Sequence, residues 1–165
     1  MKTMKKLPFF VLALLFLMGC QAKPAADNAD SEVDAVREWF TAEEPNYDLV
    51  STDTVKEGVY ALLTTFTPPG VEKGYTMVRA YIVAAEGEGY TIEALGDAYG
   101  PGSIGFSAEV LSTEEATVLF GDIGSSLYDP TTDTRRDVTF TDVAAKLADG
   151  REVSISVQNN APYIL

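Results

Sequence analysis

Three aspartates have the type and spacing to hold a cation. Asp129, Asp133 and Asp137 follow one another at intervals of four residues in a polar segment. Calcium favours several carboxylate and carbonyl oxygens, so the cluster indicates a candidate calcium site, although its spacing is not that of an EF-hand. Arg135 and Arg136 lie in the same segment and offer the alternative, an exposed loop in which surface ion pairs neutralise the carboxylates.

A second candidate chemistry is hydrolysis by two carboxylates, which needs no histidine. Glu86 and Glu88 lie close together in a predicted turn. With 25 acidic residues in the chain, some pair of carboxylates will always lie close in sequence. The alternative is that Glu86 and Glu88 are two solvated side chains without a catalytic role.

The composition excludes several common kinds of catalytic site. The chain contains no histidine, which excludes Ser-His and Cys-His nucleophile systems and the usual ligands of catalytic zinc. Gly100, Gly102 and Gly105 lack the spacing of a phosphate-binding loop and predict a bend between strands. We therefore expect no enzyme activity, no cofactor and no metal, with the two acidic groups above as alternatives.

Tyrosines are a third candidate feature. Tyr75 and Tyr81 share one face of a predicted strand, Tyr90 and Tyr99 follow nearby, and Tyr128 lies in the polar segment. Exposed tyrosines suit contacts with proteins or glycans. Half-buried tyrosines are also common on antiparallel sheets, which is the alternative interpretation.

The elements that would position these residues begin with a helix. Ser31 with Asp34 three residues later resembles a capping box and predicts the helix start, and Pro45 predicts its end. The apolar face of this helix contains Val33, Val36, Trp39 and Phe40.

A period of two then predicts antiparallel strands at 47–55, 59–66, 74–84 and 90–95, joined by turns at 56–58 and 86–89. In the third strand, the face with Val78, Ala80 and Ile82 is the better core candidate. One helix followed by a four-stranded meander resembles the topology of cystatin-like folds, which implies nothing about function.

The segment 98–102 predicts a break, and further strands are predicted at 104–111, 116–120, 138–147 and 151–158, with a last one ending at Leu165. The segment 121–137 is predicted as a long loop. Asp142 could also cap a short helix within 138–147, but a strand is favoured because it would pair with 151–158. The predicted fold is α+β, mainly antiparallel sheet of about eight strands with one N-terminal helix and a smaller β subdomain after the meander.

The first twenty residues predict an export signal. Lys2, Lys5 and Lys6 precede an uncharged apolar run at 7–18, which is too short for a membrane-spanning helix. Leu17, Met18, Gly19 and Cys20 then resemble the lipobox of bacterial lipoproteins.

In the lipoprotein family the cysteine thiol receives a diacylglyceryl group and a signal peptidase cuts before it. The resemblance therefore implies a signal peptide at 1–19 and lipidation of Cys20. The tether is predicted at 20–30 and an extracytoplasmic domain at 31–165. Two acyl chains hold a protein stably at a membrane, so the expected location is the cell membrane, lipid-anchored and facing the outside of the cytoplasm. The alternative is an ordinary secretory signal followed by a chance cysteine.

The net negative charge of the chain limits which partners it can bind. Without the three signal lysines the chain keeps 9 basic against 25 acidic residues, a formal net charge of −16. Nucleic acid is excluded as a partner because its binding needs clustered basic residues. We expect a non-catalytic binding or accessory module at the cell envelope, attached to the membrane through lipid on Cys20, with another envelope protein as partner. The alternatives are a calcium-dependent surface binding module and a carboxylate-dependent hydrolase.

Overall fold

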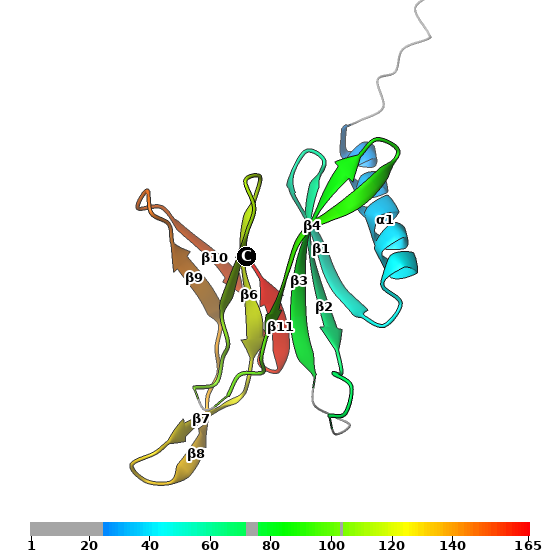
Figure 1. Ribbon diagram of the computed structural model, residues 1–165. Helices are drawn as coiled ribbons and strands as arrows, with labels where there is room; N and C mark the ends of the chain where they lie inside the picture. The colour runs from blue at the N-terminus through cyan, green and yellow to red at the C-terminus, as the bar shows by residue number, and fades with distance from the viewer. Residues whose placement is uncertain (1–24, 72–75, 103) are drawn as a thin grey trace, which may run out of the picture. The chain divides into compact units, whose positions relative to one another are not determined.

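The computed structural model describes residues 25–71, 76–102 and 104–165 (Figure 1). The chain divides into two units, Met1–Glu32 and Val33–Leu165, and the architecture described below is that of the second unit. The predicted signal peptide and Cys20 lie outside the described residues. Among the residues that are described, no helix has the length and apolar character needed to cross a bilayer.

Helix α1 spans Ala25–Glu43. The predicted start at Ser31 is wrong, and residues 25–30, which were assigned to the tether, are helical. Several alanines precede Ser31, and alanine has the strongest helix propensity, so the helix extends past the predicted cap. The predicted end is confirmed, and the last turn closes with a 2.8 Å hydrogen bond from the Glu44 amide to the Phe40 carbonyl.

The first sheet is an antiparallel meander in the order β1-β2-β3-β4, as predicted. Its strands are β1 (Asp48–Lys56), β2 (Val59–Phe66), β3 (Met77–Glu86) and β4 (Gly89–Ala98). The β3–β4 turn is tighter than predicted, because Glu86 pairs with Gly89 and only two residues remain between them. Gly87 has a φ of 61°, which glycine adopts without strain.

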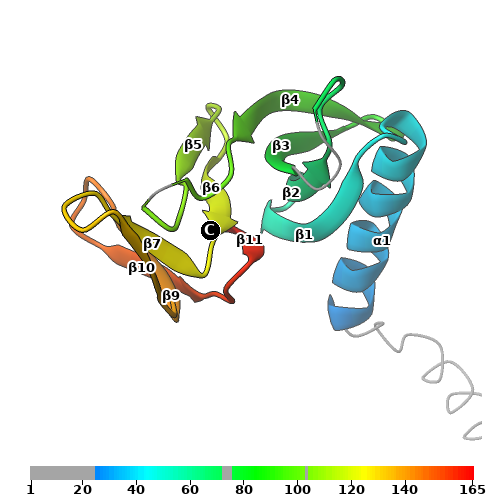
Figure 2. The ribbon, with the colours of Figure 1, turned by 90° about the horizontal axis from the view of Figure 1, so that it is seen from below.

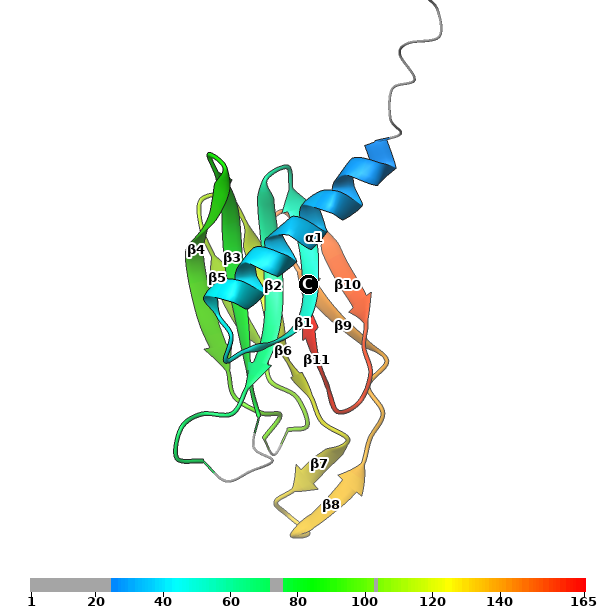
Figure 3. The same cartoon turned by 90° about the vertical axis from the view of Figure 1, so that its right-hand side faces the viewer.

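Both faces of the central strands β2 and β3 are buried, whereas only one face was predicted to enter the core. Alternate residues of β2 and β3 enter two separate cores. The predicted core face packs against a second sheet, and the opposite face packs against α1, which crosses it in Figure 3. The core under the helix contains Val36, Phe40, Tyr60, Leu62, Tyr81 and Val83.

The second sheet has three antiparallel strands in the order β11-β6-β5. They are β5 (Glu109–Ser112), β6 (Thr117–Ile123) and β11 (Ala161–Ile164). Val118, Phe120 and Ile164 are buried against the first sheet, so the two sheets form a sandwich.

Two further hairpins complete the unit. They are β7 (Ser126–Asp129) with β8 (Thr134–Asp137), and β9 (Asp142–Lys146) with β10 (Glu152–Ser156). The strand preferred within 138–147 is confirmed as β9, paired with β10. The long loop predicted at 121–137 is wrong, since that segment contains the end of β6 and the β7–β8 hairpin. The described strands number eleven, against about eight predicted.

An arginine lies at one end of the helix-covered face. The Arg79 guanidinium forms a two-pronged ion pair with the Asp97 carboxylate, in which Nη2 lies 2.8 Å from Oδ2. Its carbon lies 5.0 Å from the centre of the Tyr47 ring and 4.8 Å from that of Phe66. Charge pairing and aromatic contact together stabilise this half-buried cation.

Stability is expected to fall at alkaline pH because of Tyr81, beside this arginine. Burial raises the pKa of Tyr81 to about 12, against a smaller lowering effect of Arg79. Between about pH 10 and pH 12 the unfolded chain ionises this tyrosine while the folded chain keeps it neutral, so stability decreases by at most about 3 kcal/mol. Tyr81→Phe should flatten this decrease in urea denaturation across that range, and Tyr99→Phe, at a position 67% exposed, should not. An unchanged slope in Tyr81→Phe would contradict this assignment.

Candidate functional site

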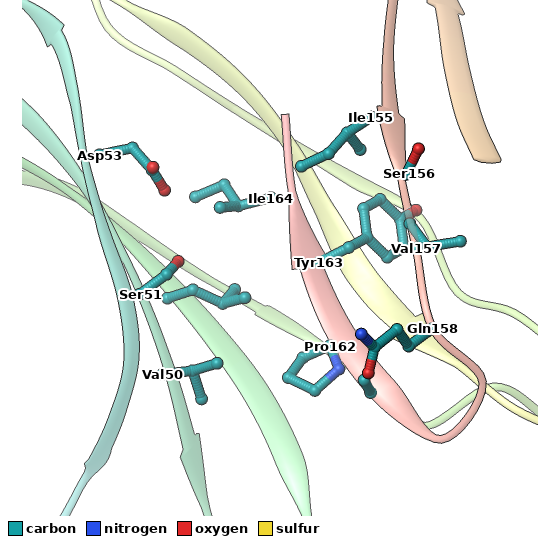
Figure 4. Close-up of a pocket in the computed structure, with 12 residues that line it drawn as sticks. Val50, Ser51, Asp53, Ile155, Ser156, Val157, Gln158, Pro162, Tyr163 and Ile164 are labelled. Atoms are coloured by element: carbon teal, nitrogen blue, oxygen red, sulfur yellow. The ribbon is translucent and has the colours of Figure 1, made fainter. Parts of the chain in front are cut away.

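The sandwich is open along one side, where the outer strands of the two sheets do not pair with each other. Strand β1 is an outer strand of the first sheet and β11 an outer strand of the second (Figure 2). Both border a groove of about 350 Å³ (Figure 4). We call this the β1 groove. It is lined by Val50, Ser51, Asp53, Leu63, Ile155, Ser156, Val157, Gln158, Ala161, Pro162, Tyr163 and Ile164.

Strand β1 directs polar side chains into the groove. Ser51 is in register with Leu63, and Asp53 with Ala61, so both lie on the face that meets the second sheet. Figure 4 shows the two side chains extending toward β11. Ser51 Oγ is buried at the wall of the groove and has no hydrogen-bond partner among the described residues.

Two bulges interrupt β1. The register with β2 skips Val50 and Val55, and these side chains are 45% and 41% exposed. Bulges in an edge strand re-aim side chains away from the regular pleat. The result is an edge strand that presents apolar side chains beside the groove.

The opposite wall is shaped by β11 and the chain leading into it. Ile164 contributes to the core between the sheets and borders the groove. Pro162 lacks a backbone N–H, so the outer edge of β11 cannot offer a complete ladder of hydrogen bonds. Tyr163 is fixed by a 2.8 Å hydrogen bond from its hydroxyl to the Ser107 carbonyl, and burial raises its pKa.

The groove continues along β1. An adjoining hollow of about 230 Å³ shares Asp53 and Ile164 with it and extends past Thr54 and Val55. Together the two spaces follow β1 from residue 50 to residue 55. A space that follows six strand residues suits an extended polypeptide segment better than a compact small molecule.

Acidic side chains surround the end of β1. Beyond Val55, a shallow hollow is lined by Lys56, Glu57, Glu93, Glu114 and Glu115. Lys56 forms an ion pair with Glu115, which leaves three glutamates in excess. Asp53 lies in the groove itself, so both the β1 groove and the hollow at the end of β1 carry negative charge.

The predicted calcium ligands do not come together. Asp129 accepts hydrogen bonds from the Thr131 amide and hydroxyl, Asp133 accepts one from the Tyr128 hydroxyl, and Asp137 lies at the other end of the hairpin. In the described part of the chain, no three acidic groups gather as a metal site requires. The calcium interpretation is therefore wrong. Asp129 and Asp133 instead shape the β7–β8 turn, in which Asp133 has a φ of 51°.

The other sequence candidates are dispersed. Glu86 and Glu88 are exposed at the β3–β4 turn, away from the β1 groove. The interpretation of Tyr81 as a surface contact is wrong, because it is fully buried.

Of the remaining tyrosines, Tyr90 is half-buried, with its ring centre 5.4 Å from that of Trp39. Tyr99 and Tyr128 are exposed, and Tyr75 lies outside the described residues.

A second hollow, of about 370 Å³, lies between the outer face of the second sheet and the β9–β10 hairpin. Its lining is almost entirely apolar, with Val110, Leu119, Leu147 and Val153 among its residues. Such a space has few polar groups to orient a ligand. The β1 groove, which combines apolar walls, an open backbone edge and a buried hydroxyl, is the better candidate binding site.

Sequence reasoning missed the β1 groove because it depends on strand order and on the unequal widths of the two sheets. The usable signals were Pro162, which predicts an edge strand, and two valines, Val50 and Val55, within a strand of mostly polar residues. Comparison with protein-family models, with curated proteins and with solved structures found no match to this chain.

Proposed function

We propose that this chain is a lipid-anchored extracytoplasmic protein whose folded unit is a non-catalytic binding module at the cell envelope. The lipobox resemblance at Leu17 to Cys20 supports the location. The observation that carries the binding function is the β1 groove, an open channel along an edge strand. The partner is another envelope protein, which the anchor brings within reach of the groove.

The groove is suited to binding rather than to catalysis. A general acid-base pair needs two titratable groups converging on one point. Asp53 is the one ionisable carboxylate that lines the groove, and Tyr163 uses its hydroxyl to hold Ser107. The remaining lining is aliphatic, hydroxyl or amide, which provides contact area and hydrogen bonds.

Photo-crosslinking in living cells tests this function. A photoreactive amino acid at Val50, beside the groove, is expected to give an adduct with an envelope protein. The same substitution at Leu95, an exposed leucine (50%) on β4 that lines neither the groove nor the second hollow, is expected to give none. Adducts from neither position, or equal adducts from both, would remove the support for the groove as a binding site.

A further inference from the structure

We infer that the β1 groove binds an extended, basic polypeptide segment, which adds to the first sheet as a fifth strand along the outer edge of β1. This inference rests on the proposed function and names the chemistry of its partner. Three features carry it: the backbone edge, the side-chain space and the charge.

The backbone edge favours strand addition at β1. Strand β1 has nine residues and is the outer strand of its sheet, so no further described strand pairs with its outward N–H and C=O groups. Such an edge is a template for pairing with another chain. The facing strand β11 is shorter and contains Pro162, so β1 is the edge able to form the longer ladder.

The side-chain space fits the alternation of an added strand. Successive side chains of a strand point to opposite faces, so every second side chain of the segment would enter the space between the sheets. That space is lined by Leu63, Ile164 and Ser51, and the Ser51 hydroxyl has no hydrogen-bond partner in the described part of the chain. Small apolar or hydroxyl side chains at alternate positions of the segment match this lining.

The charge selects a basic segment. Asp48 and Asp53 lie on β1, and Glu57, Glu93 and Glu114 surround its end. The chain from Cys20 onward has a formal charge of −16, so the same sign surrounds the groove. Complementary charge raises association rates and discourages acidic partners.

The test uses the full chain, purified in mild detergent, and fluorescent peptides of about eight residues with alternating valine and threonine. One peptide ends in lysine pairs and its match ends in glutamate pairs. We expect saturable binding of the lysine peptide by fluorescence anisotropy, and binding of the glutamate peptide weaker by about tenfold or more. Equal binding of both peptides would overturn the basic preference.

N-methylation of the lysine peptide tests the backbone ladder. Alternate amides of an added strand point toward β1, so methylating one alternate set should weaken binding by about tenfold, and methylating the other set should have little effect. This comparison changes no residue of the protein and cannot be confused with misfolding. If both sets bind like the unmethylated peptide, strand addition is overturned.

A charge reversal locates the site. Asp53→Lys should weaken binding of the lysine peptide by about tenfold, whereas Glu109→Lys, an equal charge change on β5, should leave it within about twofold. Equal weakening by both variants would show attraction to net charge alone and would overturn the assignment to this groove.

The outcomes of the peptide and crosslinking tests separate the two proposals. If position 50 gives an adduct in cells but no peptide binds, strand addition is overturned while the groove remains a binding site. An adduct with a second copy of this chain would also overturn the basic partner. If the peptides bind as expected and position 50 gives no adduct in cells, the proposed envelope function fails and the chemical preference of the groove stands.

Discussion

Gly121→Ala is expected to destabilise the folded unit by about 3 kcal/mol, through a clash that the surrounding backbone cannot relieve. A Cβ at Gly121 would overlap the carbonyl oxygen of Ser107, with the carbonyl carbon 2.7 Å away and the Tyr163 ring 3.1 Å away. Two of these atoms belong to backbone and not to the flexible end of a side chain. Relief therefore requires the whole Ser107 segment to move.

Hydrogen bonds hold that segment in place. The Ser107 amide donates to the Asp122 carbonyl at 2.9 Å, and the Asp122 amide donates to Ser107 Oγ at 2.9 Å. The Tyr163 hydroxyl donates to the Ser107 carbonyl at 2.8 Å. Moving Ser107 away from an alanine would weaken contacts between β6, β11 and the chain entering β5, which are the elements that form the second sheet.

Gly100→Ala is the matched control. A Cβ at Gly100 meets no atom within 4 Å, and a change within about 0.5 kcal/mol is expected there. Urea denaturation followed by fluorescence of Trp39, the one tryptophan, measures both variants. A Gly121→Ala midpoint equal to that of the wild type would show that the approach of Ser107 is not as close as described.

Local periodicity predicted the first half of the fold well. The apolar face of α1, the four-stranded meander and the end of the helix before Pro45 all follow from spacing and turn residues that act within a few positions. The helix start was missed because alanine propensity extended it beyond the cap at Ser31. The second buried face of β3 was missed, and it contains Arg79, whose partners Asp97 and Tyr47 come from distant parts of the chain.

The site was harder to predict because its residues meet through tertiary structure. Asp129 and Asp133 lie close in sequence and resembled metal ligands. In the structure, Asp129 accepts hydrogen bonds from the amide and hydroxyl of Thr131, and Asp133 accepts one from the Tyr128 hydroxyl. Ser51 and Ile164 lie far apart in sequence, and nothing in their spacing brings them together. The pairing of β11 with β6, which lie far apart in the chain, places β11 opposite β1, and residue spacing does not indicate such a distant pairing.

Cys20→Ala is expected to abolish fatty-acid incorporation completely. Under the lipoprotein assignment the Cys20 thiol is the acceptor of the diacylglyceryl group, and Cys20 is the one cysteine of the chain. An alanine has no nucleophile to form the thioether. Metabolic labelling with an alkyne fatty acid, followed by purification and in-gel detection, measures this directly.

Acyl labelling is a better readout than membrane sedimentation, because an uncleaved signal peptide would also sediment with membranes. Met18→Ala supplies the control, since it keeps the thiol and places a small residue in the lipobox, and it should retain the label. The alternative of an ordinary secretory signal predicts no label in the wild type. A label that persists in Cys20→Ala would place the acyl group elsewhere. Two acyl chains hold a protein stably at a membrane, whereas a processed chain without acyl groups has no anchor. A processed chain that has lost the label should therefore leave the membrane, and its groove should no longer meet envelope partners.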